Sequence, residues 1–139
     1  MAMITGAVAN DGWMVQPQLV RTVSDSAGGV RNDLNTRKYL QCFSAENASL
    51  IESYMLAVVE SGTGTRAQVD GHDIAGKTGT AQVNSSGGKY SPHAWYVGYC
   101  AEEEHPYAIA IVVENGGSGG SVAGKLAGKI MKKAIEIVK

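Results

Sequence analysis

The chain has 139 residues, a formal net charge of −1 at pH 7 and a pI near 6.3. This length suits one domain with a buried core, and the near-neutral charge gives no reason to expect nucleic acid as a partner. No apolar run reaches about 18 residues, so no membrane span is predicted, and the opening Met-Ala-Met-Ile lacks the basic start of a signal peptide.

The first third of the chain predicts one short helix followed by extended segments. Residues 1–10 favour a helix, which Asn10-Asp11-Gly12 ends with turn chemistry. Residues 13–24 are typical of extended chain, and Pro17 favours an edge strand or the entry to a strand. Ser26-Ala27-Gly28-Gly29 then predicts a hairpin-like turn into a second short extended piece.

A helix is predicted from about residue 48 to residue 60. Its apolar residues recur on one side, at Leu50, Ile51, Met55, Val58 and Val59. Asn47 can cap the start, and a capping box between Ser49 and Glu52 is the alternative. The glycines of the following Gly-Thr-Gly turn end the helix.

Three strands are predicted next, at residues 72–83, 93–101 and 107–114. The loops between them are too short for a parallel crossover helix, so we expect consecutive antiparallel pairing. Trp95 and Tyr96 in the second strand are expected in the core. Helices packed on this sheet would give an α+β fold.

The last helix is predicted for residues 121–139, starting near Gly120 or Ser121. Its apolar stripe consists of Val122, Ala123, Leu126, Ala127, Ile130, Met131, Ala134, Ile135 and Val138. Five lysines against one glutamate give this segment a net charge of +4. A membrane-surface helix is one interpretation. We favour a helix that lays Val122, Leu126 and Ile130 on the sheet and turns its lysines to solvent.

The first of the three strands carries the motif Ala75-Gly76-Lys77-Thr78-Gly79-Thr80-Ala81-Gln82. Strand alternation presents Lys77 and Gly79 on one face and Thr78 and Thr80 on the other. A glycine lets a ligand backbone lie close to the strand, and a cation beside hydroxyls can bind a carboxylate. Lys-Thr-Gly is one of three elements of the penicillin-recognising serine enzymes, with S-x-x-K and S-D-N. Alone, the motif also fits a solvated strand lysine between threonines that favour β structure.

The segments around the motif carry a wider resemblance. Residues 1–12, followed by residues 16–20, resemble the helix and exit strand found late in penicillin-binding transpeptidase domains. Residues 55–65 resemble the helix and Gly-Thr-Gly turn before the Lys-Thr-Gly strand, and residues 93–99 and 109–115 resemble the next two strands. The similarity keeps the family's order and weakens only around residues 24–43. The chain therefore resembles the C-terminal part of a class B penicillin-binding protein.

This resemblance implies a partial β-lactamase/transpeptidase-like fold, with three antiparallel core strands packed with helices, across residues 1–139 as one C-terminal portion of a domain. It also implies acyl transfer without a cofactor. A serine of the complete enzyme attacks the bond between the two terminal D-alanines of a peptidoglycan stem peptide, and β-lactams mimic that dipeptide. The complete protein is expected on the extracytoplasmic face of the bacterial membrane, anchored by an upstream segment.

The resemblance assigns roles to the motif residues. Lys77 is expected to keep the site positive and to bond the hydroxyl of the S-x-N motif. Thr78 and Thr80 are expected to bind the substrate carboxylate beside Gly79. The backbone N–H of Thr80 is expected to be one of two oxyanion-hole donors. The expected catalytic residues are thus Lys77 and Thr80, within a binding set of Lys77, Thr78, Gly79 and Thr80.

The family's nucleophile motif is missing from the expected place. Ser86-Gly87-Gly88-Lys89 is the one formal S-x-x-K, and it follows the Lys-Thr-Gly strand in a glycine-rich loop. The nucleophile needs a helix N-terminus, which two glycines oppose. The sequence contains no Ser-x-Asn. We therefore expect these 139 residues to be inactive alone and to self-associate through an uncovered sheet edge and apolar face.

Two other functions stay open at this stage. A non-catalytic recognition or interaction domain could use the same sheet, and β-lactamases and β-lactam sensors share Lys-Thr-Gly. The transpeptidase interpretation is favoured by the order of the flanking segments.

The cysteines and histidines predict no metal site. Cys42 and Cys100 lie 58 positions apart with no histidine at ligand spacing, so free thiols or a disulfide remain the alternatives. His72 and His105 are scattered in the sequence. His93 heads a strand, where it could shape a ligand rim or serve a structural role.

Overall fold

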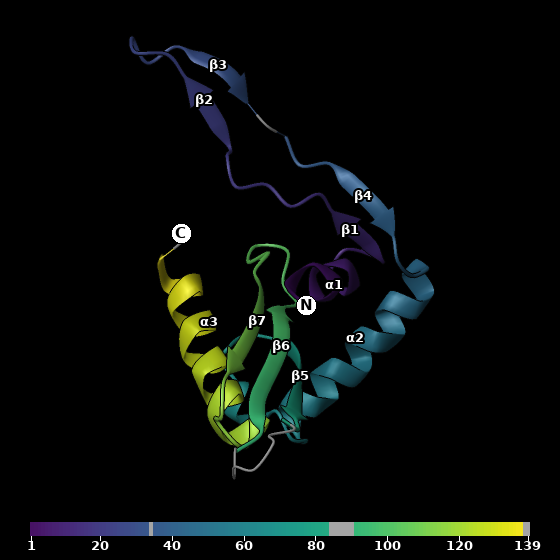
Figure 1. Cartoon of the computed structure of the whole chain (residues 1–139). Helices are drawn as coiled ribbons and strands as arrows, with labels where there is room; N and C mark the ends of the chain where they lie inside the picture. The colour runs from purple at the N-terminus through teal and green to yellow at the C-terminus, as the bar shows by residue number, and fades with distance from the viewer. Residues whose placement is uncertain (34, 84–90, 138–139) are drawn as a thin grey trace.

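The computed structural model describes residues 1–33, 35–83 and 91–137 (Figure 1). In chain order its elements are α1 Ala2–Val8, β1 Trp13–Val15, β2 Thr22–Ser24, β3 Val30–Asp33, β4 Lys38–Gln41, α2 Ala45–Glu60, the 3-10 turn η1 Thr65–Ala67, β5 Ile74–Ala81, β6 His93–Cys100, β7 Ala108–Val113, the π-helical turn η2 Gly119–Gly124 and α3 Lys125–Ile137. None of the described helices combines the length and the apolar character needed to cross a bilayer.

The centre of the molecule is an antiparallel sheet with the strand order β5-β6-β7. Gly79 on β5 lies opposite Trp95 on β6, which in turn lies opposite Val112 on β7. The predicted antiparallel sheet and α+β fold are therefore confirmed. Within the described residues β5 has a sheet partner on one side only, so its outer edge is open.

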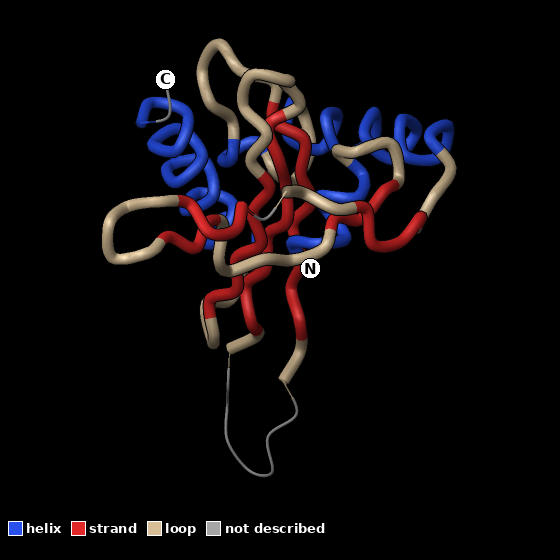
Figure 2. The backbone as a smooth tube through the Cα atoms, turned by 90° about the horizontal axis from the view of Figure 1, so that it is seen from above, coloured by secondary structure: helices blue, strands red, loops and turns tan. Residues whose placement is uncertain are grey.

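Helices cover both faces of this sheet, as Figures 1 and 2 show. On the α3 face, the buried residues are Val59, Val69, Ile74, Cys100, Met131 and Ile135 in one cluster, and Ala67, Ala94, Tyr96, Ile111, Ala123 and Ala127 in a second. On the opposite face, α1 and α2 bury Val8 and Met55 against Ala75 and Tyr99. The sheet is thus the middle layer, and the residue alternation along each strand divides the core in two.

Helix α2 begins three residues earlier than predicted. Ser44 has an extended backbone and is the N-cap, since its hydroxyl accepts a hydrogen bond from the Asn47 N–H at 3.2 Å. The predicted caps at Asn47 and Ser49 are therefore wrong. Glu52 makes no capping box, because its carboxylate accepts a hydrogen bond from the Tyr99 hydroxyl at 2.8 Å.

The last helix forms, but the face predicted to lie on the sheet is wrong. Val122, Leu126 and Ile130 are 37%, 40% and 43% exposed. The residues that pack on the sheet side are Ala123, Ala127, Met131 and Ile135. Small alanines let the helix approach the strands more closely than valine or leucine would, so the helix is rotated by about one residue. Val138 lies outside the described residues.

The predicted hairpin turn after residue 24 is confirmed, and it belongs to a long projecting arm (Figure 1). The Asp25 carboxylate accepts hydrogen bonds from the N–H groups of Ala27 and Gly29 and thereby shapes the turn between β2 and β3. Strand β4, which the sequence did not predict, pairs with β1 at the base of the arm. The predicted extended segment therefore divides between two separate strand pairs.

Candidate active site

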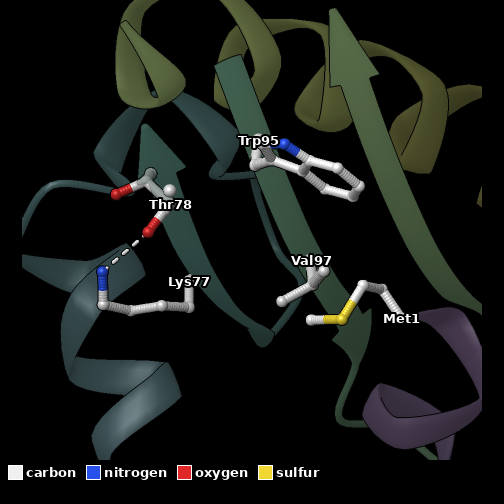
Figure 3. A pocket seen from close by; sticks show the side chains of 6 residues that line it. Met1, Lys77, Thr78, Trp95 and Val97 are labelled. Carbon is white, nitrogen blue, oxygen red and sulfur yellow. Dashed lines mark hydrogen bonds between the residues drawn. The ribbon is translucent and has the colours of Figure 1, made fainter. Parts of the chain in front are cut away.

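A groove of about 340 Å³ lies over the middle of β5 (Figure 3). It is lined by Met1, Lys77, Thr78, Gly79, Trp95 and Val97. Trp95 is only half-buried and forms part of the wall, so its predicted place in the core is wrong, whereas Tyr96 is buried as predicted. The groove combines one exposed cation with an apolar wall.

Strand alternation brings Lys77 and Gly79 to the groove. The Lys77 ammonium is exposed and donates a hydrogen bond to the Thr78 carbonyl oxygen at 2.8 Å. A Cβ added at Gly79 would approach the Trp95 Cβ to 3.2 Å and otherwise meet open space. The missing side chain at Gly79 therefore leaves β5 accessible to an extended ligand.

The two threonines of the motif turn to the other face of the strand. The Thr78 hydroxyl lies 2.8 Å from the Thr63 hydroxyl, and the Thr80 hydroxyl accepts a hydrogen bond from the Gly119 N–H at 3.4 Å. Thr63 was not singled out from the sequence, although it stands in the Gly-Thr-Gly turn before the strand. On the face of β5 away from the groove, the motif thus makes two polar contacts, one through each threonine.

Close backbone packing holds these contacts in place. A Cβ at Gly119 would collide with the carbonyl oxygen of Gly79, and a Cβ at Gly120 would come within 2.6 Å of the Thr63 carbonyl oxygen. Only glycines allow the first turn of η2 to lie directly against the motif strand and the Gly-Thr-Gly turn. The distance between β5 and η2 is therefore set by contacts between backbone atoms rather than by flexible side chains.

Two buried tyrosines of β6 flank the motif strand on opposite faces. Burial raises the pKa of Tyr96 well above its ordinary range, and its hydroxyl has no hydrogen-bond partner in the described part of the chain. Burial, followed by the hydrogen bond to Glu52 and the charge of that carboxylate, raises the pKa of Tyr99 further. Both phenols are therefore neutral throughout the physiological pH range.

The remaining candidates lie away from the groove or outside the described residues. Ser86-Gly87-Gly88-Lys89 belongs to the residues that are not described. His93 accepts a hydrogen bond from the Asn115 N–H at 3.0 Å through Nδ1, which is the structural role left open by the sequence. Cys42 and Cys100 are free thiols, and burial raises the pKa of Cys100.

A cluster that the sequence analysis missed consists of His72, Glu102 and His105. These residues look scattered in the sequence, yet Ile74 at the start of β5 lies opposite Cys100 at the end of β6. The segment just before β5, which contains His72, therefore meets the turn after β6. The predicted antiparallel pairing was the signal that could have identified this proximity.

The chain is similar to known proteins over most of its length. The family described as penicillin binding protein transpeptidase domain matches residues 1–132. The peptidoglycan D,D-transpeptidase MrdA of Acinetobacter baumannii is 32% identical over 134 residues, and PbpA of Mycolicibacterium smegmatis, also named a peptidoglycan D,D-transpeptidase, is 28% identical over 123 residues. Each alignment covers 88% of this chain, but only 20% and 25% of the relative.

Solved structures show the same architecture. The D,D-transpeptidase domain of a peptidoglycan glycosyltransferase from Eggerthella lenta superimposes with a TM-score of 0.87 and 35% identity, over 98% of this chain and 31% of that one. Penicillin-binding protein A from M. tuberculosis, in a ceftriaxone acyl-enzyme complex, gives a TM-score of 0.85 and 26% identity, over 96% and 31%. The chain belongs to the penicillin-binding protein transpeptidase domain family.

Proposed function

We propose that this chain supplies the Lys-Thr-Gly side of a peptidoglycan D,D-transpeptidase site, and that the nucleophilic serine comes from the complete protein outside these 139 residues. The observation that carries the proposal is the groove over β5, where Lys77 and Gly79 lie beside the open edge of the strand. Relatives named peptidoglycan D,D-transpeptidases and a neighbour solved as a ceftriaxone acyl-enzyme support it. The chain spans about a third or less of these proteins, so the activity is that of the complete protein.

In the proposed reaction, the serine oxygen attacks the carbonyl carbon between the two terminal D-alanines of a stem peptide. The terminal D-alanine leaves with a proton on its nitrogen, and an amine of a second stem peptide then displaces the serine from the acyl-enzyme. A β-lactam enters the same step, but its ring-opened product keeps the leaving group attached. The chain thus binds stem peptides and β-lactams as part of one site, without a cofactor.

Each motif residue has a distinct proposed role. The exposed Lys77 ammonium keeps the groove positive. In the complete protein it gives up its hydrogen bond to the Thr78 carbonyl and donates instead to the serine hydroxyl of the S-x-N motif. An extended ligand lies along the open edge of β5, where Gly79 permits close approach. The hydroxyls of Thr78 and Thr80 bind the ligand carboxylate at the open edge of β5 and give up their bonds to Thr63 and to the Gly119 N–H. The Thr80 N–H serves as one oxyanion donor.

The proposal also covers the place of this chain in the whole protein and the location of that protein. Residues 1–139 form the C-terminal portion of its transpeptidase domain, which acts on the extracytoplasmic side of the membrane through an upstream anchor. The 139-residue chain by itself self-associates, because its β5 edge and several apolar side chains are uncovered.

Fluorescent penicillin labelling of the complete protein tests the proposed site. Lys77→Ala should slow acylation at least about 100-fold, as expected for loss of a group that stabilises charge in the transition state. Thr80→Ala should have a smaller effect, because the backbone donor remains. Lys132→Ala, which changes an exposed lysine of α3, should label like the unchanged protein.

Four results would contradict the proposal. Unchanged labelling of Lys77→Ala would remove the lysine from the site. Absence of labelling in the complete, folded protein would favour a recognition domain, and rapid release of the label by hydrolysis would favour a β-lactamase. A covalent adduct on the 139-residue chain, detected by intact mass and lost in Ser86→Ala, would place the nucleophile within this sequence.

A further inference from the structure

The cluster of His72, Glu102 and His105 lies apart from the groove, where the start of β5 meets the turn between β6 and β7. Each of the three side chains offers one ligand atom, and these atoms lie within 4.8 Å of one another. None of the three residues lines the groove. The transpeptidase proposal therefore leaves this cluster without a role.

The carboxylate at the centre of the cluster is held from two sides. One oxygen of Glu102 lies 2.9 Å from His72 Nδ1, and the other accepts a hydrogen bond from the Asp73 N–H at 3.0 Å. A glutamate side chain is ionised near neutral pH, so these two contacts orient a carboxylate. An oriented, ionised carboxylate is a suitable metal ligand.

The second histidine is also fixed in place. Its backbone N–H donates to the Glu102 carbonyl oxygen at 3.1 Å. The His105 ring meets the His72 ring edge-on, with centroids 5.3 Å apart, and stacks on Tyr107 at 6.2 Å. His105 Nδ1 is buried and has no hydrogen-bond partner among the described residues. A buried ring nitrogen without a partner is costly, and a cation would satisfy it.

We propose that His72, Glu102 and His105 bind one divalent transition-metal cation of the zinc type. Two imidazole nitrogens and one carboxylate suit Zn²⁺, Ni²⁺ or Cu²⁺ better than Mg²⁺ or Ca²⁺, which prefer oxygen ligands. Tetrahedral ligand atoms around zinc lie roughly 3.3–3.5 Å apart. Ligand atoms that are up to 4.8 Å apart must therefore approach by up to about 1.5 Å, and the His72–Glu102 pair at 2.9 Å must open slightly. Solvent takes the remaining coordination position, as in other three-ligand zinc sites.

The bound cation adds a further link between two segments that the sheet and the Asp73–Glu102 hydrogen bond already join. His72 stands just before the strand that carries Lys77, whereas Glu102 and His105 belong to the β6–β7 turn. A simple His72–Glu102 ion pair also joins these segments, but it leaves His105 Nδ1 without a partner. The metal accounts for all three side chains and stabilises the start of β5.

Metal titration of the tag-free 139-residue chain, stripped with EDTA, tests the site. Co²⁺ should give saturable visible absorption at one equivalent, displaced by Zn²⁺, and Zn²⁺ should raise the midpoint of thermal unfolding. His105→Ala and Glu102→Gln should each weaken Zn²⁺ binding by about 100-fold or more. Loss of a residue that only supports a metal ligand would weaken binding less, by about 10- to 100-fold. His93→Ala is the matched control, since His93 bonds Asn115 and lies outside the cluster.

Lack of saturable binding by the unchanged chain would overturn the proposal, as would equal Zn²⁺ affinity in His105→Ala. Far-UV circular dichroism checks that the variants fold. If His105→Ala does not fold, NMR of the histidine rings in the unchanged chain tests the site instead. Zn²⁺ should shift the ring resonances of His72 and His105 and leave those of His93 in place, and any other pattern would contradict the site. Penicillin labelling reports separately on the groove.

Discussion

The two buried tyrosines of β6 differ in whether the hydroxyl has a hydrogen-bond partner. The Tyr96 hydroxyl is buried without a partner in the described structure, whereas the Tyr99 hydroxyl donates to Glu52. Tyr96→Phe should change the free energy of unfolding by less than about 1 kcal/mol or increase it. Tyr99→Phe should lower it by roughly 1.5–3 kcal/mol, because a hydrogen bond to a charged group is lost. Urea denaturation measures both, and equal losses would contradict the assignment.

Two glycines of the motif strand give a second matched pair. A Cβ at Gly76 would collide with the Tyr96 hydroxyl, so Gly76→Ala should lower the free energy of unfolding by about 1–3 kcal/mol. Gly79→Ala meets mainly open groove and should cost less stability. In the complete protein, however, Gly79→Ala should slow penicillin acylation, because the new methyl group occupies the ligand's path. Normal labelling by that variant would show that ligands do not approach β5 there.

At the scale of the element, β6 should make stability sensitive to alkaline pH. The pKa values of Tyr96 and Tyr99 are raised by burial, so both phenols stay protonated in the folded chain after the unfolded chain has lost those protons. Below about pH 10, the ordinary pKa of tyrosine, both states keep these protons and the free energy of unfolding does not depend on them. Above that pH, the free energy of unfolding falls increasingly, because only the unfolded chain loses the protons readily. Urea midpoints between pH 8 and pH 11 measure this decline. It should be smaller in Tyr99→Phe, and an unchanged slope would argue against burial of the phenol.

Elements that depend on local pattern were predictable from the sequence. Short loops and alternating residues identified β5, β6 and β7 and their antiparallel order. The rotation of α3 was not predictable, because its stripe offered both large and small apolar residues. Contact with the sheet selected Ala123 and Ala127, and Gly119 brought the helix start against β5. Tertiary packing thus decided between two faces that the periodicity left nearly equal.

The candidate site divides in the same way. The motif predicted the alternation of Lys77 and Gly79 with the two threonines, which strand geometry imposes. The partners behind the strand, Thr63 and Gly119, come from distant segments and could not be derived from spacing. The His72 cluster differs, because its members meet through the antiparallel pairing of β5 and β6, which the sequence predicted without fixing its register.

At the scale of the whole molecule, the chain has more apolar surface than its own elements cover. Val122 in η2 and Leu126 and Ile130 on α3 form an exposed stripe, the α3 stripe, and Val112 is 46% exposed on β7. The arm formed by β1 to β4 adds Leu19 and other exposed apolar residues (Figure 1). Such surface commonly marks an interface. It agrees with a chain that spans about a third or less of its relatives' length.

The α3 stripe gives the last prediction, which concerns association. Burial of Val122, Leu126 and Ile130 against a second copy would remove apolar area from water, so the 139-residue chain should show a molar mass that rises with concentration. Leu126→Lys combined with Ile130→Lys should return it toward the monomer mass, because charged groups resist burial. Lys132→Gln, an exposed position on the same helix, should associate like the unchanged chain. Light scattering after size-exclusion chromatography measures all three. A mass that stays monomeric at every concentration, or association unaffected by the lysine pair, would exclude the stripe as the contact surface.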